Sequence, residues 1–251
     1  DVVASAEDVT GDAGDAGDAG DAGDAGDAGD VGDAAWLDAQ LAGMPDAAVE
    51  IPFAPLWWPT VVDLTATLAN DFPELFGTAA PSAVRGLQTD LLGRLSTVSG
   101  PVLLGAFHQQ LTMGQRLLLD LQDPPDDPPR TAFARFCVRM ATGGAWAELG
   151  AEFELFPGLV ATAIRQWRQV VVELLTRVRR HRTELQRDFG VPASTPIAGV
   201  MLSAGDQHND GRTVALLSFG GIDLVYKPRD MGLELLWSQL LAAVSEASAA
   251  S

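Results

Sequence analysis

Hydrophobic residues recur at three- and four-residue steps between residues 61 and 189, a spacing that predicts amphipathic helices. Residues 123–129 contain four prolines and are expected to form a loop, because a helix cannot cross such a run. Residues 51–59 mix aromatic side chains with three prolines and are expected to form an extended segment packed on a surface. The predicted helical segments are residues 61–121, 131–146, 147–155 and 158–189.

The pattern changes to that of strands after residue 197. An apolar, β-branched run over residues 214–219 and an alternating run over 222–227 flank two glycines, and this arrangement predicts a β-hairpin. Apolar residues over 233–244 then recur at helical spacing, so a further amphipathic helix should follow. The predicted fold class is therefore α+β, with helices first and a hairpin and helix after them.

The first 35 residues differ from the rest in composition. From Gly11 to Ala34 the chain consists of Gly-Asp-Ala triplets, one of them replaced by Gly-Asp-Val. Small side chains and dense like charge bury too little surface to offset the entropy of ordering, so residues 1–35 are expected to be a disordered arm. A collagen helix is excluded because the triplets lack proline and place an Asp beside every Gly. The arm is either a solvated linker or an acidic interaction segment.

The net charge of −18 comes mainly from this end of the chain. Residues 1–50 hold 14 acids and no Lys or Arg, whereas residues 51–251 hold 20 acids and 16 bases. The acidity therefore says little about the partners of the folded region, and no nucleic-acid partner is expected. Seven arginines lie on the polar faces of the predicted helix 158–189, either as a solvated surface or as a surface for phosphate or acidic peptide.

A single cysteine, Cys137, excludes an intramolecular disulfide framework and a cysteine-based zinc cage. It lies at helical spacing from Phe133 and Met140, which favours a buried core thiol. The alternative is a nucleophile with His108 or His181 as its base. No apolar run is long enough to span a bilayer and no signal-peptide pattern is present, so we expect a soluble cytoplasmic protein.

Polar residues suited to catalysis are concentrated in GDQHNDGR, residues 205–212, and in LVYKPR, residues 224–229. Asp206 and His208 are two residues apart, so in an extended segment they face the same side and can act as an acid–base pair. Lys227 is the only lysine in a chain with 15 arginines. A lysine on the inner strand of a hairpin, followed by a helix, is how protein kinases present a cation to ATP phosphates.

These two motifs, with the strand VALLSF and the glycine turn between them, resemble the dehydratase domain of class II lanthipeptide synthetases (LanM type). The resemblance covers roughly residues 40–251 and is strongest from about residue 150, through Phe153–Leu159 and the predicted helix Trp167–Phe189. It implies a kinase-like fold related to lipid kinases. Residues 36–195 would be its helical part and residues 196–251 the start of its N-lobe.

The resemblance also implies a bifunctional enzyme of lantibiotic biosynthesis. Such an enzyme phosphorylates Ser and Thr of a ribosomal precursor peptide, leader plus core, with ATP and Mg²⁺, and then eliminates the phosphate to leave dehydroalanine or dehydrobutyrine. Carried over to this chain, Lys227 would hold the ATP phosphates, and Asp206 and His208 would take part in the elimination. Arg212 and Arg229 are plausible phosphate neighbours and receive no assigned role.

In this family the catalytic loop, the Mg²⁺ ligands and a zinc-containing cyclase domain lie further along the chain. Residues 36–251 are therefore expected to be an incomplete dehydratase domain that neither phosphorylates nor dehydrates a peptide on its own. Two alternatives stay open. One is a non-catalytic remnant that binds a peptide or partner through its helical region. The other is a helical scaffold in which Asp206, His208 and Lys227 are only polar residues beside a hairpin.

Overall fold

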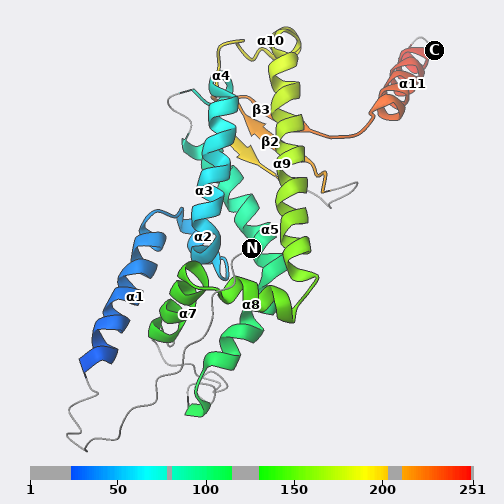
Figure 1. Ribbon diagram of the computed structural model, residues 1–251. Coiled ribbons are helices and arrows are strands. Elements are labelled where there is room, and N and C mark those ends of the chain that lie inside the picture. The colour runs from blue at the N-terminus through cyan, green and yellow to red at the C-terminus, as the bar shows by residue number, and fades with distance from the viewer. Residues whose placement is uncertain (1–23, 78–80, 115–129, 203–210, 250–251) are drawn as a thin grey trace, which may run out of the picture.

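The computed structural model describes residues 24–77, 81–114, 130–202 and 211–249 and shows long helices with a small sheet at one end (Figure 1). It confirms the predicted mostly helical protein with a small antiparallel sheet. The helices are α1 (Asp24–Ala42), α2 (Asp46–Val49), α3 (Ala54–Asp71), α4 (Pro73–Phe76), α5 (Pro81–Gln110), α7 (Arg130–Thr142), α8 (Ala145–Glu152), α9 (Phe156–Arg180), α10 (Arg182–Phe189) and α11 (Gly232–Ala249), and the strands are β1 (Gly199–Met201), β2 (Ala215–Ser218) and β3 (Asp223–Tyr226).

The larger of two hydrophobic clusters joins α3, α5 and α9 to the sheet. Leu91 of α5 and Trp167 of α9 have no exposed surface at its centre, and Phe219 at the end of β2 is 1 % exposed. Because helices and strands contribute to one cluster, the sheet is part of the same core as the helices.

A second cluster lies at the other end of α5, where α7, α8 and the start of α9 meet it. Its centre is aromatic: the rings of Phe107 and Phe136 are 5.4 Å apart in an edge-on arrangement, and the ring of Phe53 lies 6.0 Å from that of Phe136. Such pairs add to the free energy of burial through their ring quadrupoles. Cys137 is fully buried in this cluster, as the sequence predicts for a core thiol.

The sheet is antiparallel, in the order β1-β2-β3. Strands β2 and β3 form the predicted hairpin, with Leu217 opposite Leu224. Gly220 (φ 62°) and Gly221 (φ 107°) make the turn, and these positive φ values explain why glycines occupy both positions. The sequence does not predict β1, because three residues are too few to carry a period; it pairs with β2, with Val200 opposite Leu217.

Helix α5 and strand β1 approach each other closely at Gly86. A Cβ atom at Gly86 would lie 1.9 Å from the carbonyl oxygen of Val200, so only glycine fits at this contact. The backbone N–H of Ile197 also donates a hydrogen bond of 2.7 Å to the carbonyl of Leu75, at the end of α4. These backbone contacts fix the sheet on the helical region.

The prediction of an extended segment over residues 51–59 is wrong, because α3 begins at Ala54 and includes two of the three prolines. Pro55 lies in the first helical turn, where its missing N–H would have no partner in the helix. Pro59 lies further inside, and the buried indoles of Trp57 and Trp58 compensate for its effect by packing into the core.

Two further boundaries differ from those expected. Residues 24–35, expected in the disordered arm, lie in α1, which packs against α7 with Leu37 buried; residues 1–23 lie outside the described residues. The predicted single helix 158–189 is two helices, α9 and α10, with an interruption at His181. There Arg182 donates a hydrogen bond of 2.7 Å to the carbonyl of Thr195, which ties α10 to the segment before β1.

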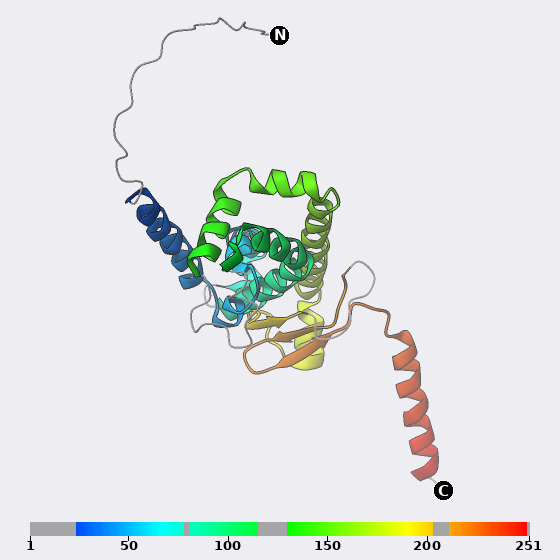
Figure 2. The same cartoon turned by 90° about the horizontal axis from the view of Figure 1, so that it is seen from below.

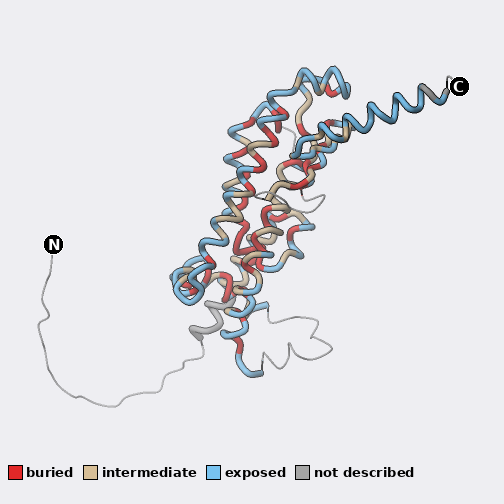
Figure 3. Tube along the Cα trace, turned by 90° about the vertical axis from the view of Figure 1, so that its right-hand side faces the viewer, coloured by how far each residue is buried: buried red, intermediate tan, exposed pale blue. Residues whose placement is uncertain are grey.

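Helix α11 projects away from the remaining elements (Figures 1 and 2). Nearly all of its described residues are exposed (Figure 3). Apolar side chains are among them, with Leu233 79 % and Trp237 60 % exposed. Its apolar face therefore has no partner among the described residues. Within the described part of the chain, no helix is both long and apolar enough to cross a membrane.

Candidate active-site region

The predicted acid–base pair, Asp206 and His208, lies in residues 203–210, outside the described residues. The chain on both sides of this segment is described. Before it, Leu202 is 5 % exposed and belongs to the larger hydrophobic cluster. After it, Gly211 and Arg212 contact the helices α5 and α9.

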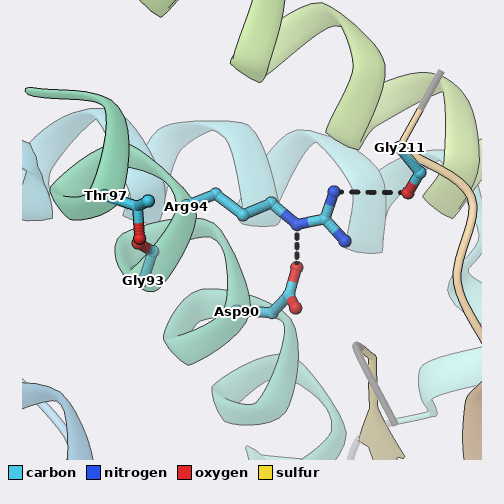
Figure 4. Close-up of polar contacts among 5 residues, drawn as sticks. All are labelled: Asp90, Gly93, Arg94, Thr97 and Gly211. Atoms are coloured by element: carbon cyan, nitrogen blue, oxygen red, sulfur yellow. Dashed lines mark hydrogen bonds and ion pairs between the residues drawn. The ribbon is translucent and has the colours of Figure 1, made fainter. Parts of the chain in front are cut away.

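The contact to α5 is made by Arg94 (Figure 4). The side chain of Arg94 is 10 % exposed. Its Nε donates a hydrogen bond of 2.7 Å to Oδ2 of Asp90, one helical turn earlier, and Asp90 is 8 % exposed. Its Nη1 reaches the carbonyl oxygen of Gly211 at 3.4 Å. One planar guanidinium therefore joins a partly buried carboxylate on α5 to the carbonyl of Gly211.

The backbone conformation and the close neighbours of Gly211 both favour glycine at this position. Its φ of +83° is a conformation that other residues adopt only with strain. A Cβ at this position would also lie 3.3 Å from Nη1 of Arg94 and 3.5 Å from Cβ of Gln166 on α9. The glycine of the sequence motif GDQHNDGR thus permits both the turn and the close approach to the helices.

A hollow of about 410 Å³ lies beside Arg94, between α5 and α9. Its volume is within the range of small-molecule sites. A carboxylate, a guanidinium, hydroxyls and an amide face it and could form hydrogen bonds with a polar group. Its lining residues are Thr89, Asp90, Gly93, Arg94, Thr97, Val98, Ala163 and Gln166.

The side chain of Arg212 forms an ion pair with Glu173 on α9. Its Nε donates a hydrogen bond of 3.1 Å to Oε2 of Glu173, and its side chain is 30 % exposed. Glu173 also accepts a hydrogen bond of 2.5 Å from Nη2 of Arg177. Arg212 is assigned no role from the sequence, and the structure shows that it holds the chain to α9.

Lys227 follows β3 directly and is exposed. Leu224 and Tyr226 on the same strand are half-buried towards the core, whereas Val225 is 60 % exposed, so strand alternation places Lys227 on the outer face with Val225. Among the described residues, no acidic side chain forms an ion pair with Lys227. Its ammonium group is therefore accessible to an anion from solution.

The second arginine of the motifs, Arg229, forms an ion pair with Glu234 in the first turn of α11. Asp230 accepts a hydrogen bond of 2.8 Å from the backbone N–H of Gly232 and so satisfies a free donor at the start of α11. Arg229 and Asp230, which follow Lys227, thus stabilise the first turn of α11. Arg229 is engaged there, and a phosphate-binding role for it stays untested.

Tyr226, the only tyrosine of the chain, points to the inner side of β3. Burial raises the pKa of its phenol. The guanidinium of Arg177 lies 5.7 Å from the ring centroid, a cation–π distance. Tyr226 therefore links β3 to α9 and is a structural neighbour of Lys227.

Asp90 and Arg94 are not predicted as site residues from the sequence. Their spacing of four residues, with the acid first, is a signal for an ion pair on a helix. Such pairs usually lie on a solvated surface, so the spacing alone could not reveal that this one is partly buried. The partner Gly211 lies 117 residues further along the chain, a contact that no local pattern indicates.

The other candidate groups gain no catalytic role from the structure. Burial raises the pKa of the Cys137 thiol to about 12, so it stays protonated and unreactive at neutral pH. His181 lies on the surface with its Nδ1 3.5 Å from Oε1 of Glu184. Among the described residues, no three His, Cys, Asp or Glu side chains gather closely enough to hold a metal ion.

Comparison with protein-family models gives a match to the C-terminal part of the chain. A family model described as a domain of unknown function (DUF4135) matches residues 155–251, which is less than half of the chain. The matched part runs from α9 through the hairpin to α11 and includes Glu173, Arg212 and Lys227. A search of curated proteins finds no match.

Proposed function

We propose that the chain is part of a class II lanthipeptide synthetase. The activity would be the conversion of Ser and Thr in a ribosomal precursor peptide into dehydroalanine and dehydrobutyrine. The reaction has two steps, phosphorylation of the hydroxyl by ATP and elimination of phosphate. The motifs that carry this resemblance lie in the part of the chain that the family model matches.

The environment of Lys227 supports the proposal most directly. The chain uses arginine for every other base, and its one lysine stands at the end of a hairpin strand, exposed and without an ion pair among the described residues. A compact ammonium group in this position fits the phosphate oxygens of ATP. ATP with Mg²⁺ would supply the phosphoryl group, and no described residue is assigned to the metal.

In the second step, a base removes the proton from Cα of the phosphorylated residue while the Cβ–O bond breaks. The electron pair of the C–H bond forms the double bond, and phosphate leaves with the bonding electrons of the Cβ–O bond. This step needs a base at Cα and an acid or cation at the leaving oxygen. Asp206 and His208 are the proposed pair for these two roles.

The experiment combines the full-length synthetase with a leader-bearing precursor peptide, ATP and Mg²⁺, and follows the peptide by mass spectrometry. With Lys227→Ala, neither phosphorylated nor dehydrated peptide should form. With His208→Ala, phosphorylated peptide should accumulate. Arg180→Ala removes an exposed base of α9 and should behave as wild type. Normal dehydration by both site variants would contradict the assignment of Lys227 and His208.

A further inference from the structure

Strand β3 has a free edge among the described residues, because the sheet order β1-β2-β3 pairs it with β2 alone. The N–H of Phe219 donates a hydrogen bond of 2.8 Å to the carbonyl of Ile222, and this pair begins the ladder between β2 and β3. In an antiparallel ladder every second residue exchanges hydrogen bonds with the partner strand, so Asp223 and Val225 do not bond to β2. The N–H and C=O groups of these two residues therefore point away from the sheet.

An apolar groove of about 360 Å³ opens at this edge, between the hairpin and the helices α9 and α10. Val225 lines the groove although its side chain lies on the outer face of the sheet, so the groove reaches the backbone edge of β3. Apolar side chains line it from both sides, namely Val178, Leu185 and Phe189 from the helices and Leu217 and Leu224 from the hairpin. The volume is within the range of sites that enclose small groups.

A free strand edge beside an apolar groove is the arrangement by which proteins bind an extended peptide as an added strand. The backbone of such a peptide would pair with Asp223 and Val225. Because side chains alternate along a strand, every second side chain of the peptide would point to the inner face of β3 and into the groove. Val225 and Phe189 are 60 % and 57 % exposed on the two sides of the groove. Large apolar side chains exposed together are typical of a surface that a partner covers.

The charges around the groove select the peptide. Arg177 and His181 line the groove, and no carboxylate lies among its described lining residues. Glu173 accepts a hydrogen bond from Nη2 of Arg177, but a guanidinium has five N–H donors and can bind a second acceptor. An acidic residue in the peptide is therefore favoured over a basic one. A second copy of this chain is a less suitable occupant, because pairing two β3 edges would bring together two grooves of the same charge.

We propose that the edge of β3 and this groove bind an extended peptide that is apolar at alternate positions and carries an acidic residue. The peptide adds a further strand to the sheet, and its apolar side chains fill the groove between the hairpin and α10. The site uses backbone groups of Asp223 and Val225 and apolar side chains of the helices. It is independent of the proposed function, because none of these residues is assigned to ATP or to phosphate elimination.

The first test measures binding to the 251-residue chain by fluorescence anisotropy. The probe is a short fluorescein-labelled peptide in which leucine and threonine alternate, with a glutamate at one end. Two further peptides carry N-methyl groups, one on all leucine amides and the other on all threonine amides. Only one set of N–H groups can face β3, so one methylated peptide should bind at least about tenfold more weakly and the other should bind as the probe does. Equal binding by both, or no saturable binding of the probe up to about 1 mM, would overturn the proposal.

The second test changes the protein. Val225→Pro removes an edge N–H that β2 does not use, so the hairpin should keep its ladder while the probe binds about tenfold more weakly. Phe189→Ser should weaken binding to a similar extent by removing an apolar side chain from the groove. Leu233→Ser on α11 is the matched control, because it removes a side chain that is 79 % exposed and lies outside the groove, and it should leave the affinity unchanged.

Circular dichroism checks that each variant is folded. The methylated peptides need no change in the protein, so they decide the question even if Val225→Pro does not fold. Wild-type affinity in Phe189→Ser would overturn the proposal. So would a dimer in analytical ultracentrifugation that the probe dissociates, because a second copy would then be the occupant of the edge.

Discussion

Glu173 and Arg212 are joined by a hydrogen-bonded ion pair of 3.1 Å across 39 residues of chain. The pair connects α9, the longest helix of the matched region, to a residue shortly before the first strand of the hairpin. Arg212, to which the sequence assigns no role, thus holds the backbone to α9. The position of Arg212 therefore depends on a helix that ends well before it in the sequence.

The ion pair should contribute measurably to stability. Glu173→Gln and Arg212→Gln, singly and together, should give a coupling energy of about 1 kcal/mol in a double-mutant cycle followed by urea unfolding. The side chains are 24 % and 30 % exposed, so water screens the pair only in part. The same cycle on Arg187 and Asp188, exposed at 69 % and 45 %, should give a coupling near zero. Equal couplings for the two pairs would contradict this account.

The contact between α5 and β1 should tolerate no side chain. Gly86→Ala places a Cβ atom 1.9 Å from the carbonyl oxygen of Val200, so the helix and the strand must separate. We expect a loss of about 3 kcal/mol or more in the free energy of unfolding, measured in urea. Gly105→Ala, on the same helix with open space around it, should instead raise stability by roughly 0.5–1 kcal/mol.

The buried thiol of Cys137 should cause the free energy of unfolding to fall as the pH rises above about 9.0. Burial raises the pKa of its thiol from 9.0 to about 12. The unfolded chain therefore releases this proton at lower pH than the folded one, so the contribution is complete below pH 9.0 and is lost as the pH rises to about 12. The slope approaches about 1.4 kcal/mol per pH unit. Cys137→Ala should remove that part of the decline, and identical pH curves for the two proteins would argue against it.

Lys227 should not be replaceable by arginine, although every other base of the chain is an arginine. Lys227→Arg keeps the positive charge but changes a compact ammonium group into a broad planar one. Phosphorylation of the precursor peptide should fall about 100-fold or more, as for loss of one transition-state contact. Melting temperature should stay unchanged, because the side chain is exposed. Full activity of this variant would leave the lysine without a specific role.

Replacing Trp167 and replacing Trp237 should change the free energy of unfolding to very different extents. Trp167→Ala empties a fully buried site on α9 and should cost about 3–5 kcal/mol. Trp237→Ala on α11 removes a side chain that is 60 % exposed and should change stability by no more than about 0.5 kcal/mol. Urea unfolding followed by circular dichroism measures both variants. A large loss for Trp237→Ala would show that the apolar face of α11 is covered in solution.

The sequence pattern predicts those elements whose signal is local. A long run of apolar residues at three- and four-residue steps predicts α9, and two glycines between apolar runs predict the hairpin. Both signals are local, because turn and helix preferences act over a few residues. The start of α3 is missed because the rule against proline in helices is weaker in the first turn and is outweighed by two buried indoles. Strand β1 is missed because it exists only through its pairing with β2 and its contact with Gly86.

For the candidate site too, the sequence predicts only the residues whose signal is local. The motif residues can be selected from the sequence because unusual residue types stand close together, as with the one lysine beside the one tyrosine. Arg94 could not be selected, since its surface-like spacing from Asp90 conceals a partner 117 residues away. Contacts over such distances are decided by the packing of whole elements and leave no trace in a short window.

The long separation between Arg94 and Gly211 also bears on the order of folding during synthesis. Helix α5 leaves the ribosome more than a hundred residues ahead of the hairpin, so its face can form before the strands exist. The hairpin closes locally, but β1 gains its place only on that prepared face, and contacts of such high contact order form late. A nascent chain arrested before Gly211 should therefore hold a folded helical region to which the sheet is added last.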